Sequence, residues 1–205
     1  MKQKTGLIWM SAGNSYFKED IIKEIMNYAL KEFDKLIILA PDEPAEHTYL
    51  VLGYPKNRAK RKSKLNANLL QNRAKRIKDS LNKENQEKIH IVEWIDEIIP
   101  NKQYQDSYKN ILNLFKSNKE FQKDALDNAK KVIETKGKEL EKEAPKQAVY
   151  YLLKELAFLT TSPEIYNTDS ISYIYHKPWP IYKKYIKGYY DKKPKDNLKF
   201  VLHEG

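Results

Sequence analysis

The chain has 205 residues, of which 40% are apolar and 12% aromatic, and this is enough for one full-sized domain with a substantial core. It has no cysteine, which excludes a disulfide scaffold, a thiol nucleophile and any zinc site built on cysteine. Four scattered histidines do not suggest a metal site, and no apolar run approaches the ~20 residues of a membrane span. We therefore expect a soluble cytoplasmic protein that is not associated with a membrane, with residues 1–205 forming a single domain.

The net charge of +10 comes from one window. Between Glu46 and Asp79 there is no acidic residue, and the window holds ten basic ones: Lys56, Arg58, Lys60, Arg61, Lys62, Lys64, Arg73, Lys75, Arg76 and Lys78. Outside it, basic and acidic residues are equal in number. A local excess of this kind indicates a polyanionic partner.

The first elements predict a parallel sheet. Residues 5–10 form a short apolar run typical of a strand buried on both faces, and Ser11 to Ser15 are turn-forming residues. A helix with regularly spaced apolar residues is expected over 18–34, and a second buried strand over 36–40. Strand, turn, helix and strand in this order make a βαβ unit.

The basic window predicts one long helix from about 56 to 81. Its apolar residues are few, and we expect the buried stripe to consist of Ala59, Leu65, Leu69, Ala74, Ile77 and Leu81. The rest of its surface is then cationic.

In the remaining chain we expect a third strand over 90–94, helices over 103–117 and 119–143 with a break near Gly137, and an apolar helix over 146–160. The alternating residues 170–175 predict a strand, and 198–202 a closing one. The fold class is α/β: a single Rossmann-like domain with a central, mostly parallel sheet.

Three groups of residues are candidates for chemistry. Ser11 and Asn14 follow the first strand, where open parallel sheets bind ligands, although such a turn can also simply cap the next helix. Tyr151 and Glu155 share one face of the apolar helix, where a buried carboxylate is costly without a partner; alternatively, Glu155 faces solvent beside Lys154. Tyr175 and His176 end a strand, where they either face a cleft or only pack.

Taken together, Ser11-x-Gly-Asn14-Ser-Tyr-Phe, Tyr151-x-x-x-Glu155 and Tyr175-His176 resemble the tRNA-dependent cyclodipeptide synthases, and Asn14, Tyr175 and His176 resemble the Asn-Tyr-His branch of that family. The resemblance extends from about residue 7 to 179. It implies a fold similar to the catalytic domain of class I aminoacyl-tRNA synthetases, without the ATP site.

The resemblance also implies roles. Ser11 matches the nucleophile that accepts an aminoacyl group, and Asn14 the asparagine of its loop. Tyr151 and Glu155 match the pair that holds the substrate's α-amino group. Tyr175 matches a tyrosine thought to assist proton transfer, with His176 as its neighbour.

The expected reaction makes a cyclic dipeptide from two aminoacyl-tRNAs through an aminoacyl-serine, without ATP or metal, since the ester is already activated. The tRNA would bind Lys60, Arg61, Lys62, Lys64, Arg73, Lys75, Arg76 and Lys78 on the long basic helix. We expect no DNA partner and a monomer. Two alternatives stay open: a non-catalytic RNA-binding domain, and a serine hydrolase of aminoacyl esters.

We expect the substrate side chains to lie among uncharged residues: Leu7, Trp9, Leu39, Trp94, Phe158 and Tyr173. Apolar walls favour apolar substrates and leave a charged side chain unpaired. The two tryptophans take up space. The prediction is therefore a product built mainly from leucine, such as cyclo(Leu-Leu), with leucine-tRNA as substrate and phenylalanine or methionine as minor partners.

Overall fold

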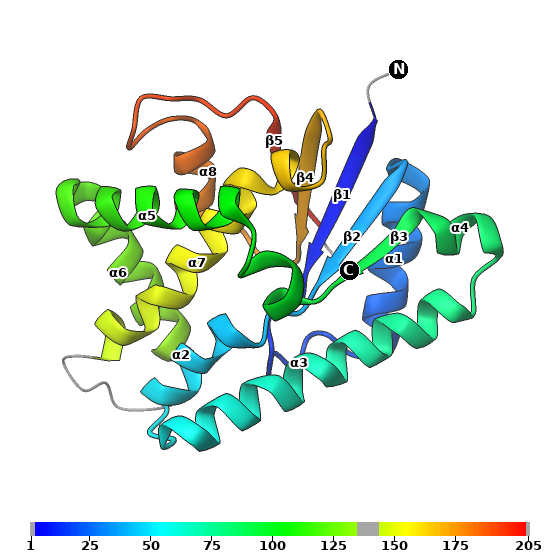
Figure 1. The fold of residues 1–205 in the computed structure, drawn as a ribbon, viewed down its shortest axis with the longest axis horizontal. Helices are drawn as coiled ribbons and strands as arrows, with labels where there is room; N and C mark the ends of the chain where they lie inside the picture. Colours follow the sequence, from blue (N-terminus) through cyan, green and yellow to red (C-terminus); the bar gives the residue numbers. More distant parts are fainter. Residues whose placement is uncertain (1–2, 135–143, 204–205) are drawn as a thin grey trace.

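A five-stranded parallel sheet forms the centre of the molecule (Figure 1). The computed structural model describes residues 3–134 and 144–203. The strands are β1 (Lys4–Trp9), β2 (Lys35–Leu39), β3 (Ile89–Val92), β4 (Ser170–Tyr175) and β5 (Leu198–Leu202), in the order β3-β2-β1-β4-β5. The chain first builds outward from β1 to β3 and then returns to place β4 on the other side of β1. The direction of winding therefore changes between β1 and β4, where sheets of this kind bind ligands.

Helices cover both faces of this sheet. On one face Ile8, Ile38 and Ile174 pack with α1 (Glu19–Glu32) and α3 (Lys56–Asp79), and α4 (Lys83–Lys88) leads into β3. On the other face Leu7 and Leu39 pack with residues of α5 (Lys102–Ser117), α6 (Lys119–Glu134), α7 (Ala144–Ile165) and α8 (Pro180–Ile186). The helix α2 (Glu43–Val51) packs against both α3 and α7. Figure 1 shows α3 crossing the carboxyl-terminal end of the sheet.

Most elements agree with the sequence-based expectations, including the parallel sheet and the long helix α3. Three short helices, α2, α4 and α8, were not predicted. For α2 the reason is that helices pack on two sides of it, so it has no single apolar face to detect. The third strand ends at Val92, and Trp94 begins a π-helical turn, η1 (Trp94–Ile98). The break expected near Gly137 lies outside the described residues.

The buried stripe predicted for α3 is partly wrong. Leu65 is 66% exposed and Leu69 is 48% exposed. The helix instead buries mainly small side chains, namely Ala59, Ser63, Ala67, Leu70, Gln71, Ala74 and Ile77. These recur every three or four residues, so the buried face is regular, but its small side chains are less conspicuous in the sequence than leucine.

Two further findings concern the described residues as a whole. None of their helices is both long and apolar enough to span a membrane. Within 3–134 and 144–203, no three His, Cys, Asp or Glu side chains gather in a way that could hold a metal ion.

Candidate active site

Ser11 lies at the change of winding direction, two residues after β1 ends. A hydrogen bond of 3.2 Å joins its hydroxyl to that of Tyr175, the last residue of β4. Met10 holds the chain in place before Ser11, because its backbone N–H donates to the Leu39 carbonyl at 2.7 Å. Two adjacent parallel strands thus bring together residues that are 164 positions apart in the sequence.

The loop after Ser11 is shaped by its own residues. The Asn14 N–H donates to the Ser11 carbonyl at 3.0 Å, and the Asn14 side-chain oxygen accepts from the Tyr16 N–H at 3.0 Å. These bonds make a local turn. The alternative that Asn14 or Ser15 caps the next helix is wrong, because α1 begins after Lys18 and no side chain caps it.

Gly13 allows this loop to rest against α2 and α3. Its φ of +78° belongs to the left-handed region, and a Cβ added there would lie 2.5 Å from the Tyr49 hydroxyl. That hydroxyl, from α2, accepts a hydrogen bond from the Asn66 amide of α3. The loop that carries Ser11 is therefore braced by the basic helix.

Tyr151 approaches the same place from α7. Its hydroxyl accepts a hydrogen bond of 3.0 Å from the indole N–H of Trp9. Burial raises the pKa of Tyr151 well above its usual value of 10, and hydrogen bonds with Trp9 and Ser11 oppose this only in part. Tyr151 is therefore a neutral phenol next to Ser11.

Glu155, one turn further along α7, is a buried carboxyl group. It is 7% exposed, and the Tyr173 hydroxyl donates to its Oε1 at 3.4 Å. Burial raises its pKa to about 8, so most of the population is protonated at neutral pH. The alternative that Glu155 faces solvent beside Lys154 is wrong, since Lys154 pairs with Glu43 of α2 instead.

Four tyrosines surround this carboxyl group. Its negative charge raises the pKa of each of them, in addition to the larger effect of burial: Tyr151, Tyr173, Tyr175 and Tyr182. For Tyr175 the pKa is raised to about 12. At neutral pH these phenols are therefore protonated, and they can donate hydrogen bonds but not act as bases.

His176 packs beside this group as a neutral ring. It stacks on Tyr16 with 3.8 Å between ring centroids and meets the edge of Phe17 at 5.5 Å. Burial lowers its pKa to about 4, and neither ring nitrogen has a hydrogen-bond partner among the described residues. This arrangement supports the loop after Ser11 by packing.

The six residues predicted to line the side-chain pockets all lie in the cluster on the α7 face of the sheet, each at most 1% exposed: Leu7, Trp9, Leu39, Trp94, Phe158 and Tyr173. The Trp9 ring centroid lies 5.8 Å from those of both Trp94 and Phe158. The six residues are therefore part of one apolar, aromatic core on this face of the sheet. Their contact with substrate stays a prediction.

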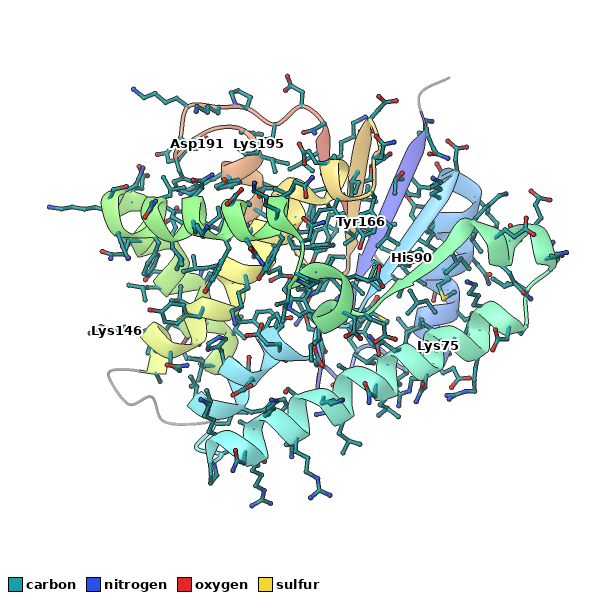
Figure 2. The ribbon with its side chains drawn as sticks, in the orientation of Figure 1. Lys75, His90, Lys146, Tyr166, Asp191 and Lys195 are labelled. Carbon is teal, nitrogen blue, oxygen red and sulfur yellow. The ribbon has the colours of Figure 1, made fainter. Side chains whose placement is uncertain are left out.

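The predicted tRNA-binding residues of α3 divide into two groups. Among the described residues, Lys60, Arg61 and Lys64 form no ion pair, and Lys62 donates to the Tyr54 hydroxyl at 3.1 Å. The other four bind protein partners: Arg73 the Phe17 carbonyl, Lys75 (Figure 2) Glu93, Arg76 Glu19, and Lys78 the Ile89 carbonyl. The first half of α3 therefore has fewer protein partners for its charges than the second half, and binding of tRNA by either half stays a prediction.

Sequence reasoning did not assign Tyr173, Tyr182, Tyr49 or Asn66 to this cluster of interactions. Tyr173 was expected only as a pocket wall. Its alternation with Tyr175 on β4 puts both rings on one face, 5.7 Å apart, which is a signal that the sequence does contain.

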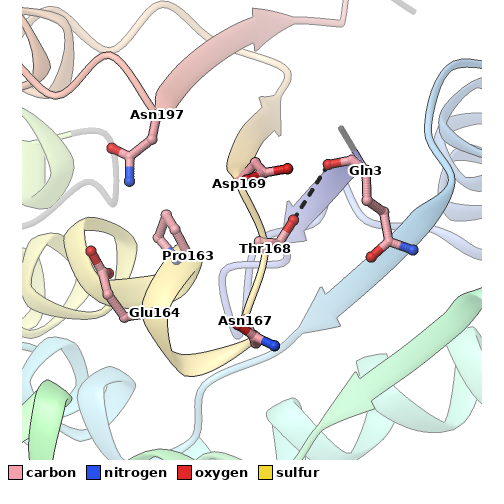
Figure 3. Close-up of a pocket in the computed structure, with 7 residues that line it drawn as sticks. All are labelled: Gln3, Pro163, Glu164, Asn167, Thr168, Asp169 and Asn197. Atoms are coloured by element: carbon pink, nitrogen blue, oxygen red, sulfur yellow. Dashed lines mark hydrogen bonds between the residues drawn. The ribbon is translucent and has the colours of Figure 1, made fainter. Parts of the chain in front are cut away.

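A separate cavity of about 480 Å³ lies at the other end of the strands (Figure 3). Its lining is polar and includes Gln3, Glu164, Asp169 and Asn197. It contains none of the predicted site residues. The carboxyl-terminal end of the sheet, where Ser11 and Tyr175 meet, remains the candidate active site.

Solved structures with a similar fold identify the fold class of this chain. A Mycobacterium tuberculosis protein, whose structure is described as demonstrating that cyclodipeptide synthetases are related to type I tRNA synthetases, matches with a TM-score of 0.82 over 98% of this chain and 85% of its own, at 19% identity. The structure of a cyclodipeptide synthase (CDPS) from Staphylococcus haemolyticus matches with a TM-score of 0.87 over 99% of this chain and 92% of its own, at 25% identity. The expected Rossmann-like α/β fold is confirmed.

The family follows from the sequence. A family model described as cyclodipeptide synthase matches residues 2–203, and the chain belongs to this family. A Staphylococcus haemolyticus relative named cyclo(L-leucyl-L-leucyl) synthase is 24% identical over 98% of this chain and 87% of its own length. A Bacillus subtilis relative with the same name is 25% identical over 87% of this chain and 73% of its own.

Proposed function

We propose that this enzyme joins two aminoacyl groups from two aminoacyl-tRNAs into a cyclic dipeptide through an ester on Ser11. The observation that carries the proposal is the Ser11 hydroxyl, bonded to Tyr175 at the change of winding direction and close to the buried Glu155 cluster. Asn14, Tyr175 and His176 support membership of the Asn-Tyr-His branch.

The first step is ester exchange. The Ser11 oxygen attacks the ester carbonyl of one aminoacyl-tRNA, the bond to the ribose oxygen breaks, and the serine proton ends on the released tRNA hydroxyl. Tyr175 is placed to pass this proton, because it bonds to the Ser11 hydroxyl. The ester is already activated, so the step needs neither ATP nor a metal.

Two amide bonds then form. The amine of the aminoacyl-Ser11 attacks the ester carbonyl of a second aminoacyl-tRNA, which leaves a dipeptidyl-Ser11 and a second free tRNA. The new terminal amine attacks the Ser11 ester, the ring closes, and the serine hydroxyl is restored. The balance is two aminoacyl-tRNAs in, and one cyclic dipeptide with two tRNAs out.

Glu155 and Tyr151 would hold the α-amino group. An ammonium placed next to Glu155 gives the carboxylate a cationic partner, which lowers its pKa. Glu155 therefore ionises when substrate binds. The partner is aminoacyl-tRNA, drawn by the first half of α3, and we propose that a monomer binds it.

The product is assigned to leucine. The relatives named for cyclo(L-leucyl-L-leucyl) support this, and so does the apolar character of the predicted pocket residues such as Leu7 and Phe158. We expect cyclo(Leu-Leu) as the main product, with phenylalanine or methionine as minor components.

Mass spectrometry of the medium from cells that express the protein tests the proposal. Cyclic dipeptides are expected for the wild type and for Ser15→Ala, a control in the same loop, but not for Ser11→Ala. Incubation with labelled leucyl-tRNA should leave label on Ser11. Free leucine as the only product would indicate a hydrolase, and RNA binding with no acyl-enzyme would indicate a non-catalytic domain.

A further inference from the structure

Two leucines are exposed on the basic helix α3. Leu65 is 66% exposed and Leu69 is 48% exposed, and they lie one helical turn apart. Arg61, also exposed, lies one helical turn before Leu65 on the same surface. The two side chains form an apolar surface, here called the leucine patch, within a cationic one.

The leucine patch belongs to the part of α3 that also supports the nucleophile loop. Asn66, which follows Leu65 directly, donates its amide hydrogen bond to Tyr49, against which Gly13 rests. Ser11 is two residues before Gly13. The patch lies on the exposed face of this part of α3, opposite the buried face, and α3 crosses the carboxyl-terminal end of the sheet in Figure 1.

The positive charge around the leucine patch indicates what kind of molecule can bind there. No acidic residue occurs between Glu46 and Asp79, so a second copy of this chain docked symmetrically here would bring two cationic helices together. A polyanion is complementary to this surface, and the unpaired bases of a single strand add apolar faces that can contact leucine.

We propose that the leucine patch binds the unpaired bases of the single-stranded 3′ end of aminoacyl-tRNA, which sets the position of the ester relative to Ser11. This inference rests on the proposed function. The cations Lys60, Arg61 and Lys64 hold phosphates, and Leu65 and Leu69 hold the apolar faces of unpaired bases that precede the ester-bearing nucleotide.

This division predicts different responses to salt. Binding through phosphate contacts weakens as salt rises, by about 0.7 log units per contact and per tenfold change in salt for a single strand. Apolar contact releases no counterions. Loss of the leucines should therefore weaken binding without changing the salt dependence, whereas loss of the cations should flatten it.

The test measures tRNA binding to the Ser11→Ala protein, which prevents turnover. Two probes are compared: leucine-accepting tRNA and the same tRNA trimmed of its single-stranded 3′ nucleotides. Leu65→Ser with Leu69→Ser should weaken binding of the intact tRNA by about tenfold and leave binding of the trimmed tRNA unchanged. Val132→Ala, a change at a 45% exposed residue of α6, serves as the control and should affect neither.

Several results would overturn the inference. These are unchanged binding by the leucine variant, an equal loss with both tRNAs, a change in its salt slope, or a wild-type dimer that the leucine changes dissociate. Thermal melting of each variant verifies that it is folded. Product formation is measured separately in proteins that keep Ser11. Normal product formation and normal binding by the leucine variant refute the patch alone, whereas the expected binding pattern together with no cyclic dipeptide from the wild-type protein refutes the chemistry alone.

Discussion

Replacing Glu155 by Gln should stabilise the fold at alkaline pH while it lowers activity. The carboxyl group is 7% exposed, and burial raises its pKa to about 8 from 4.5. Between these two values the unfolded chain is ionised at this position and the folded protein is not. The folded state therefore binds one more proton, and the free energy of unfolding falls as the pH rises.

The size of the effect follows from the shift. One pKa unit corresponds to about 1.4 kcal/mol, so the loss is about 1.4 kcal/mol per pH unit and about 5 kcal/mol in total above pH 8. Gln keeps the shape and cannot ionise. Its free energy of unfolding should lack this slope, and the difference from the wild type should be absent near pH 4 and largest above pH 8.

Urea unfolding of both proteins from pH 5 to 9 measures the difference. Glu164→Gln provides the matched control, since Glu164 is an exposed carboxylate of the same helix, and its curve should follow that of the wild type. Product formation by Glu155→Gln should fall about ten- to a hundredfold or more, because a charge-assisted bond of about 1.5–3 kcal/mol to the substrate ammonium is lost. Parallel stability curves for Glu155→Gln and the wild type would refute the buried, protonated state.

Three further changes test the surroundings of Ser11. Gly13→Ala should cost about 1–3 kcal/mol of stability and most of the activity, because the φ of +78° and the Tyr49 hydroxyl at 2.5 Å leave no room for a Cβ; thermal melts and product yield measure both. Arg73→Gln should lower kcat rather than raise KM for tRNA, because Arg73 donates to the Phe17 carbonyl at 2.7 Å; an unchanged kcat with a raised KM would make it an RNA contact. Tyr175→Phe should slow formation of the acyl-enzyme in single-turnover assays, since it removes the bond to the Ser11 hydroxyl, and an unchanged rate would exclude a proton relay.

The sheet was predictable because its signals are local. The continuous apolar runs of β1 and β2 are typical of strands buried on both faces. The alternating residues of β4 are typical of a strand with one face more buried than the other. The buried stripe of α3 was not predictable in the same way. Leucine normally marks the core, and here alanines occupy it while Leu65 and Leu69 face solvent.

The sequence predicted which residues come together in the candidate site, but not their burial or their pKa values. Spacing places Tyr151 and Glu155 on one face of a helix, but it does not say which face is buried. The decisive contact is Glu155 with Tyr173, between α7 and β4, and it depends on how that helix packs on the sheet. The sequence also did not predict the partners of the last four cations of α3, because some of these partners, such as Glu19 and Glu93, are distant in the sequence.

The helix α3 joins the two halves of the proposed function. Its outer face carries the cations and the leucine patch. Its inner face holds the nucleophile loop at two points, through Asn66 and Tyr49 at Gly13 and through Arg73 at the Phe17 carbonyl. A substitution on the inner face of this helix therefore acts on the position of Ser11, and one on the outer face acts on RNA binding, although both lower activity. For that reason, loss of activity alone does not identify an RNA contact, whereas the slope of tRNA binding against salt does, since only phosphate contacts contribute to it.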